Sequence, residues 1–238
     1  MSSNARINIR PLYLQVRDVL VDRILAGEWK PGIPTPTEHQ LAAELNVSLG
    51  TVRRALKQME DEFVINRQQG RGTFVNDQST AQLALRFSNL YDLSDRQIEG
   101  DIIATETETG FPSAEEAKLL GIESSDSVIR VRRVRSHLSR KFAVEACVLP
   151  SSLFPSLPPD VGYYRIGALT QQNKLLISGG EEYVEAKMAS EAIAGVLEIP
   201  KGEVVLTLNR FLRCTTGRVV EWRSASWHAQ NIRYRSPV

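Results

Sequence analysis

Small hydroxyl and cationic side chains open one amphipathic run in the first third of the chain. Ser48, Thr51 and Arg53 follow one another there, and Arg54 comes next. The first turn of a helix has free backbone N–H groups and can approach a phosphate closely. An arginine can bind a guanine edge with two hydrogen bonds, or a phosphate. These residue types at this spacing predict a surface that contacts nucleic acid.

Three helices are expected to position these side chains. Apolar residues at helical spacing predict a helix over 11–26. Thr37 begins a second helix, because Gln40 three residues later completes a capping box. Ser48 is the natural cap of a third helix, which we expect to run to about Asp61.

A hairpin is expected directly after the third helix. Residues 63–65 are interpreted as one strand, 67–72 as a Gly-rich basic turn, and 73–75 as the partner strand. Two glycines would let the tip approach a duplex closely, with Arg71 available to probe a groove. A helix–turn–helix alone is often an ordinary helical corner, but the added basic hairpin favours a winged-helix DNA-binding domain.

Composition limits the remaining alternatives. The 238 residues have a net charge of +1, so the nucleic-acid signal is local and not global. Cys147 and Cys214 lie in apolar runs without a Cys-x-x-Cys or His–Cys cluster, which predicts buried thiols and no metal site or cofactor. No apolar stretch approaches the ~20 residues that span a bilayer, and no signal peptide is evident, so we expect a cytoplasmic protein with no membrane partner.

The second half contains an internal repeat with an offset of 77 positions. The matched pairs are Ala117 with Ala194, Leu120 with Leu197, Ile122 with Ile199, and Arg133 with Arg210. Each block leads into two strands, which predicts two hairpins related by a pseudo-twofold and joined in one antiparallel sheet of an α+β domain. Chance similarity is the alternative. Glu145 and Glu221 are expected at nearly equivalent places in the two blocks, one residue away from the common offset.

Alternation along the strand 128–137 places Arg133 and Arg135 on one half-apolar face, together with Ile129 and Val131. Two arginines on such a face are unfavourable unless an anion meets them. Glu145 on the next strand offers a purely structural ion pair. The other interpretation is a ligand carboxylate or phosphate bound by the arginines, with Glu145 accepting from an amine or hydroxyl.

Residues 11–75 resemble the GntR family of bacterial transcription regulators. The resemblance rests on PLYLQVRDVLVDRILAGEWKPG, PTEHQLAAELNVSLGTVRRAL and RQQGRGTFV. It implies DNA contacts from the starts of the second and third helices and from the wing. With the outward-facing Arg54, these positions are Thr37, His39, Ser48, Leu49, Gly50, Thr51, Arg53, Arg54, Gln69, Gly70, Arg71 and Gly72.

Two of these positions depart from the family pattern. His39 and Leu49 stand where the family usually has arginine. Each lost phosphate contact weakens binding and its salt dependence, so we expect weaker binding or a shifted operator. Leu49 can still contact a thymine methyl group.

Residues 100–235 resemble the UTRA domain of HutC-type GntR regulators. The resemblance rests on AEEAKLLGI, VIRVRRVR, VEACVLPSSLFPSL and VVEWRSASWHAQNIRY. It implies a chorismate lyase-like fold with a small-molecule pocket. The matching pocket positions are Arg133, Arg135, Glu145, Glu221 and Trp227, the last replacing a usual tyrosine. The segment YYRIGALTQQ lacks a serine typical of members that bind sugar phosphates, so a carboxylate effector stays open beside a phosphate.

The sequence therefore predicts three parts: a winged helix-turn-helix domain at 1–77, a linker at 78–98, and an effector-binding and dimerisation domain at 99–238. We expect a homodimeric repressor on a palindromic double-stranded DNA operator, controlled by a small anionic metabolite. One rival is a chorismate lyase-like enzyme fused to a DNA-binding head, although no residue stands out as its general base. The other is an architectural DNA binder without a ligand.

Overall fold

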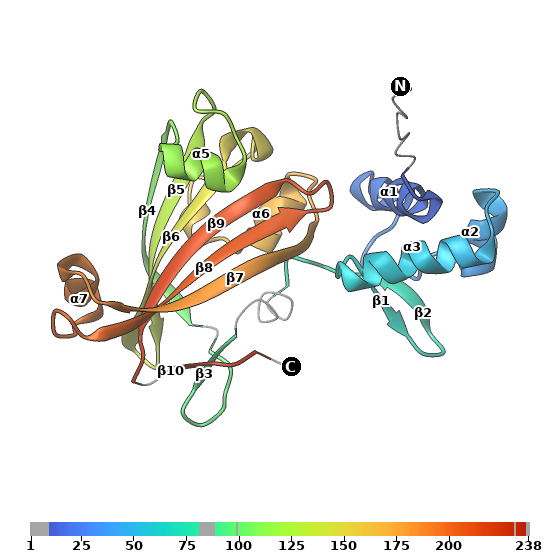
Figure 1. The fold of residues 1–238 in the computed structure, drawn as a ribbon. Helices are drawn as coiled ribbons and strands as arrows, with labels where there is room; N and C mark the ends of the chain where they lie inside the picture. Colours follow the sequence, from blue (N-terminus) through green and yellow to red (C-terminus); the bar gives the residue numbers. More distant parts are fainter. Residues whose placement is uncertain (1–9, 81–88, 99, 231, 237–238) are drawn as a thin grey trace, which may run out of the picture. The chain divides into compact units, whose positions relative to one another are not determined.

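The computed structural model describes residues 10–80, 89–98, 100–230 and 232–236. The chain divides into two compact units, Met1–Asp77 and Gln78–Val238, each of which is described by itself (Figure 1).

The first unit contains the three predicted helices. They are α1 (Leu12–Leu25), α2 (Glu38–Glu44) and α3 (Leu49–Asp61), followed by the hairpin strands β1 (Ile65–Gln68) and β2 (Gly72–Val75). Both predicted caps are present. Thr37 accepts a hydrogen bond from the backbone N–H of Gln40, whose side chain bonds back to the cap, and Ser48 accepts from the N–H of Thr51. The helices enclose fully buried Leu20, Leu41, Val52, Leu56 and Met59.

The hairpin begins later than the sequence suggested. Phe63 has a φ of 58° and closes the turn after α3, so it cannot belong to an extended strand. The expectation of a strand at 63–65 was wrong for its first two residues. Gln68 pairs with Gly72, which shortens the turn to residues 69–71.

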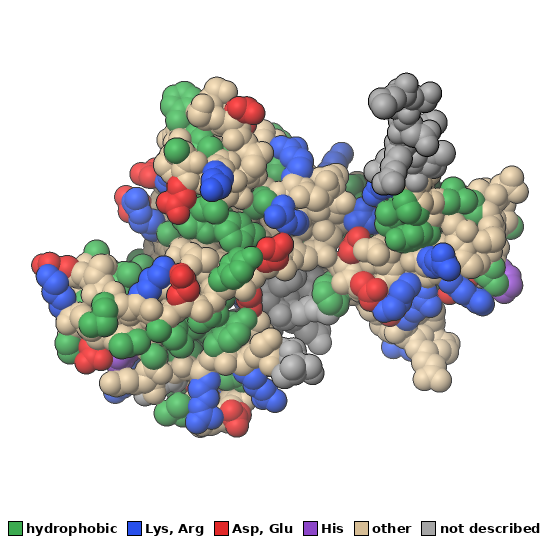
Figure 2. Space-filling view, in the orientation of Figure 1, with side chains coloured by type: hydrophobic (Ala, Val, Ile, Leu, Met, Phe, Trp, Pro, Cys, Tyr) green, Lys and Arg blue, Asp and Glu red, His purple; other side chains and the backbone are tan. Residues whose placement is uncertain are grey.

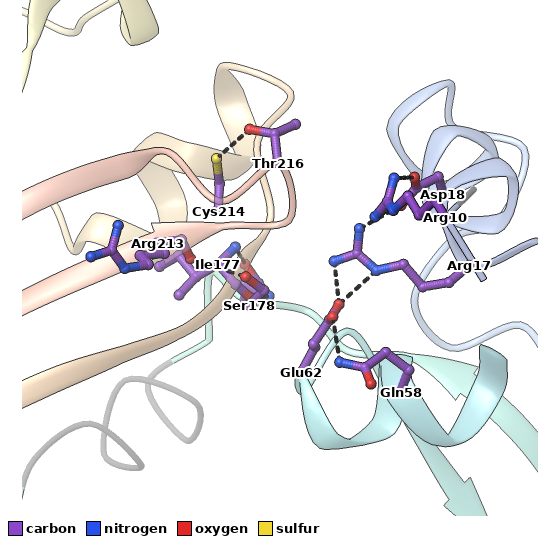
Figure 3. A network of polar contacts seen from close by, with 11 residues as sticks. Arg10, Arg17, Asp18, Gln58, Glu62, Ile177, Ser178, Arg213, Cys214 and Thr216 are labelled. Atoms are coloured by element: carbon purple, nitrogen blue, oxygen red, sulfur yellow. Dashed lines mark hydrogen bonds and ion pairs between the residues drawn. The ribbon is translucent and has the colours of Figure 1, made fainter. Parts of the chain in front are cut away.

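A partly buried ion pair joins α1 to the residue after α3 (Figure 3). The Nε of Arg17 donates to Glu62 at 2.9 Å, and Gln58 donates to the same carboxylate. Burial alone would lower the pKa of Arg17, but the hydrogen bonds to Glu62 and Asp18 raise it. Arg17 therefore stays charged inside the unit, and Glu62 is the acceptor that makes its burial tolerable.

The second unit is built around one six-stranded antiparallel sheet with the strand order β4-β5-β6-β9-β8-β7. The first block comprises β4 (Asp101–Gly110), α5 (Ala114–Leu120), β5 (Val128–His137) and β6 (Arg140–Pro150). The second comprises β7 (Ile177–Met188), α7 (Glu191–Leu197), β8 (Val204–Cys214) and β9 (Val219–His228). The predicted pair of hairpins joined in one sheet is confirmed, since β6 pairs with β9 at the centre.

The two blocks share their packing as well as their order. Each helix packs against both central strands, β6 and β9, and the two helices lie at opposite ends of the sheet (Figure 1). Leu120 and Val128 form one small core there, and their repeat mates Leu197 and Val205 form the other. The repeat seen in the sequence is thus a repeat of structure.

The other face of the sheet is covered by the connection between the blocks. This connection contains η1 (Ser151–Leu153), η2 (Val161–Tyr163) and α6 (Ile166–Gln172). Leu153, Phe154 and Leu169 from it pack against Ile129 and Cys147 of the sheet.

The segment 78–98 was expected to be an interdomain linker that contributes a strand or a helix turn. Residues 81–88 of it lie outside the described residues. Strand β3 (Leu90–Asp92) pairs with β10 (Ile232–Tyr234) near the C-terminal end. Gln78 is buried and bonded to β7. The described residues of this segment are therefore structural parts of the second unit.

The repeat offers a direct measure of backbone strain. Gly121 ends α5 with a φ of 65°, and its repeat mate Glu198 ends α7 with a φ of 59°. A left-handed conformation costs a non-glycine residue roughly 1 kcal/mol. Glu198→Gly should therefore raise the free energy of unfolding by about 1 kcal/mol, and Gly121→Ala should lower it by a similar amount, in urea denaturation.

The control separates strain from charge. Glu198 also pairs with Lys141 at 2.7 Å on the surface, and such pairs contribute little. Lys141→Ala removes the ion pair alone and should change stability only slightly. A Glu198→Gly protein less stable than the wild type would contradict the strain argument.

Candidate functional site

The predicted DNA-contacting residues lie at three places on the first unit: the start of α2, the start of α3 and the hairpin tip. All of them are exposed or half-buried, and Leu49 and Thr51 are the half-buried ones. Figure 2 shows Lys and Arg side chains gathered over α3 on the visible face, with acidic side chains beside them. The hydroxyls of Ser48 and Thr51 hydrogen bond to each other at 2.9 Å. The start of α3 is therefore fixed by its own cap.

An acidic residue that sequence reasoning missed lies among these cations. Glu38 accepts a hydrogen bond from the Nε of Arg53 at 2.7 Å, and its other oxygen is 3.3 Å from Arg67. One carboxylate thereby connects α2, α3 and β1. The sequence offered only one hint of this role, namely that Glu38 directly follows the helix cap Thr37.

The second unit contains a partly open cavity of about 640 Å³ against the sheet face that the connection covers. Four of the five predicted effector residues line it, namely Arg133, Arg135, Glu145 and Trp227. Glu221, the fifth, is only 1% exposed and is bonded to Arg223 at 2.9 Å. It is not among the lining residues, but it supports Arg223, which does line the cavity.

One buried carboxylate serves three arginines at the cavity wall. The Nη1 of Arg135 lies 3.2 Å from Glu145, that of Arg223 at 3.6 Å and that of Arg133 at 3.9 Å. Burial alone would raise the pKa of Glu145, but Arg223, Arg135 and Arg133 lower it to about 2. Glu145 is therefore an anion across the physiological range and a poor proton acceptor.

Buried donors at this wall have no hydrogen-bond partner among the described residues. They are the Nε of Arg133, the Nε of Arg223 and the indole N–H of Trp227. Leaving such donors unsatisfied is unfavourable. The lining also carries five arginines, with Arg165 and Arg210 besides the three above, against the three acids Asp101, Glu145 and Asp160. The cavity is suited to an anion.

The strand register corrects the expected match between the two glutamates. Arg133 pairs with Glu145 in the first block, whereas its repeat mate Arg210 pairs with Arg223 in the second. Arg223 thus takes the place of Glu145, and Glu221 takes the place of Ala143. The two glutamates share a face but are not equivalent, because the second hairpin is one residue longer between the paired positions.

The alternation of side chains along a strand places Arg223 on the same face as Glu221, two residues earlier, so Arg223 could have been predicted as a pocket residue. Arg210 was visible as the repeat mate of Arg133. The partner of Arg210 in an ion pair, Glu182 at 2.6 Å, had no signal in the sequence.

Burial raises the pKa of Cys147 to about 12, and both cysteines are buried and free. Across the described ranges, no group of His, Cys, Asp and Glu is arranged to hold a metal ion.

The chain is similar to known proteins over both units. Residues 12–75 match the family model "Bacterial regulatory proteins, gntR family", and residues 102–233 match "UTRA domain". In the part that the structure describes, no helix has the length and apolar character to cross a membrane.

Curated relatives match nearly end to end. The mannosyl-D-glycerate transport/metabolism system repressor MngR of Escherichia coli K12 is 27% identical, covering 94% of this chain and 95% of its own. The histidine utilization repressor of Pseudomonas aeruginosa is 29% identical, covering 88% of this chain and 83% of its own. The crystal structure of the possible regulator YydK from Bacillus subtilis shares the fold, with a TM-score of 0.55 and 19% identity over 96% of this chain and 100% of its own.

The charge of Glu145 makes a prediction about pH. Its pKa is about 2 in the folded protein against 4.5 ordinarily, so its charge stabilises the fold above about pH 4.5 and stops doing so as the pH falls to about 2. Glu145→Gln should therefore lower the free energy of unfolding most near neutral pH. The difference from wild type should shrink in acid, because the wild-type carboxyl is then neutral too. Urea denaturation at several pH values measures it, and a difference independent of pH would contradict the account.

Proposed function

Because this chain belongs to the gntR family of bacterial regulatory proteins that carry a UTRA domain, we propose that it is a ligand-controlled repressor. The first unit binds operator DNA, with α3 in the major groove and the β1–β2 hairpin beside it. The second binds a small anionic metabolite. The protein acts as a homodimer on a palindromic operator, since twofold protein symmetry matches twofold DNA sites.

The observation that carries the ligand part is the set of unsatisfied buried donors in a positively charged cavity. A carboxylate or phosphate accepting from Arg133, Arg223 and Trp227 would fill those hydrogen bonds. Glu145 would accept from an amine or hydroxyl of the same ligand. Two of the relatives are named for histidine and for mannosyl-D-glycerate, and both compounds carry a carboxylate.

The cavity also touches the segment that follows the DNA-binding unit. Gln78 and Ser79, the first residues of the second unit, line it together with Asn89 and Leu90. The side chain of Gln78 bonds both the N–H and the carbonyl of Ile177, each at 2.7 Å. A Cβ on Gly167 would lie 2.0 Å from the Gln78 carbonyl, so the segment is closely packed. A ligand that favours one position of this segment would change the equilibrium of the DNA-binding units by its differential affinity.

We infer binding and not turnover as the role of the cavity. None of the described histidines is among the residues that line it. Glu145, with a pKa of about 2, is held as an anion by its arginines and is a weak general base. The chorismate lyase-like alternative would therefore need another of the lining acids, Asp101 or Asp160, as its proton acceptor in place of Glu145.

A thermal-shift screen tests ligand binding. Small carboxylates, amino acids and phosphorylated metabolites are added to the full-length protein, and at least one should raise its melting temperature. A ligand at about 100 times its Kd stabilises by about 2.7 kcal/mol. Arg133→Ala should abolish the shift, whereas Arg218→Ala, a surface arginine outside the cavity lining, should retain it. A shift that survives Arg133→Ala would place the ligand elsewhere.

Coupling is tested at Gln78. Gln78→Ala should leave the operator affinity of the ligand-free protein largely intact but reduce the effect of saturating ligand on operator affinity, because the segment then loses its two bonds to Ile177. Asn173→Ala is the matched control, since Asn173 also bonds backbone groups but lies outside the cavity lining. Fluorescence anisotropy with labelled operator, with and without the compound from the screen, gives both values. Undiminished coupling in Gln78→Ala would exclude this route.

A further inference from the structure

The carboxylate of Glu38 has an unfavourable position for a protein that binds DNA. It lies on the proposed reading surface, where it is 26% exposed and where phosphates must approach. A negative charge there weakens binding to every duplex equally. Its presence among these cations is therefore unfavourable for DNA affinity alone.

The contacts of Glu38 indicate a compensating role. It accepts from the Nε edge of Arg53 at 2.7 Å, which leaves the two Nη groups of Arg53 available. A guanidinium held at one edge by a carboxylate is fixed in its plane, and its flexible side chain is ordered before DNA arrives. The free edge is the one that binds O6 and N7 of guanine with two hydrogen bonds.

The same carboxylate also acts on the hairpin. Its second oxygen is 3.3 Å from Arg67 of β1, and Arg67 additionally lies 3.7 Å from Glu60 of α3. Arg54 and Arg71, by contrast, form no ion pair with any described residue and are exposed. The start of α2 and the start of α3 otherwise present His39 and Leu49, neither of which is a fixed cation. Arg53 is therefore the oriented cation at the start of α3, as Arg67 is on β1.

We propose that Glu38 is a specificity-determining positioning residue, which holds Arg53 so that its free edge reads a guanine in each operator half-site. The proposal rests on the DNA-binding function proposed above. An exposed ion pair without such a role would contribute little to stability and nothing to sequence preference. A merely repulsive carboxylate would lower affinity for all sequences alike.

The experiment begins with the full-length wild-type protein and a pool of random duplexes. Repeated selection yields a preferred sequence, and each guanine in it is then replaced in turn. Dissociation constants are measured by fluorescence anisotropy at several salt concentrations for wild type, Glu38→Gln and Arg53→Ala. Melting temperatures of both variants check that the fold is retained.

Wild type should discriminate against replacement of one guanine per half-site by about tenfold or more. Arg53→Ala should lose that discrimination, and Glu38→Gln should lose most of it at the same guanine. Affinity of Glu38→Gln for an unrelated duplex should be unchanged or higher, because one repulsive charge has gone. Glu44→Gln is the matched control: this glutamate of the same helix pairs with Arg23 of α1, and its loss should leave the preference intact.

Three results would overturn the proposal. In the first, Glu38→Gln keeps the wild-type discrimination while Arg53→Ala loses it, and only the role of Glu38 fails. In the second, Glu38→Gln gains affinity equally for all duplexes and keeps its preference, so the carboxylate is only repulsive. In the third, the wild type selects no sequence, and the proposed function fails together with this inference.

Discussion

The second unit depends on one shared carboxylate. Glu145 is buried on the sheet between Arg133, Arg135 and Arg223, which come from β5 and β9. Charged side chains that are removed from water are tolerated only when they are paired. Removing one partner leaves an uncompensated buried charge, which strongly destabilises the fold. The strands must therefore keep their register for the cluster to exist. The same wall still presents unsatisfied donors to a cavity, so the cluster stabilises the sheet and leaves room for one more anion.

The two blocks share one scaffold, and the polar residues that differ between them give the asymmetry of the ligand site. Helix caps, small cores and the pairing of β6 with β9 are common to both blocks. The polar residues on the sheet face are not, since Arg223 replaces Glu145 and Leu212 replaces Arg135 at the equivalent places. One cavity with a charged wall results, in place of two half-sites. Its lining includes Gln78 at the start of the unit, and any ligand is thereby adjacent to the segment following the DNA-binding unit.

Sequence reasoning succeeded where the determinants are local. The caps at Thr37 and Ser48 depend on neighbours three residues away, and strand alternation was enough to bring Arg133 and Arg135 to one face. It failed where the structure depends on strand register and on contacts between residues far apart in the sequence. The equivalence of Glu145 with Arg223 depends on the length of a hairpin, and the contacts of Gln78 with Ile177 join residues 99 positions apart. The late start of β1 follows from the left-handed backbone conformation of Phe63, and the residue type of Phe63 does not predict that conformation.

The central claim is that binding of an anion in the cavity and binding of operator DNA to the first unit shift the same conformational equilibrium of the protein. Coupling between two sites is reciprocal in binding free energy. The most direct measurement is calorimetric titration of the ligand into the full-length protein, free and saturated with operator. The account predicts that the ligand's Kd changes by the same factor by which the ligand changes operator affinity. Equal ligand affinity in the free and DNA-bound protein would contradict it.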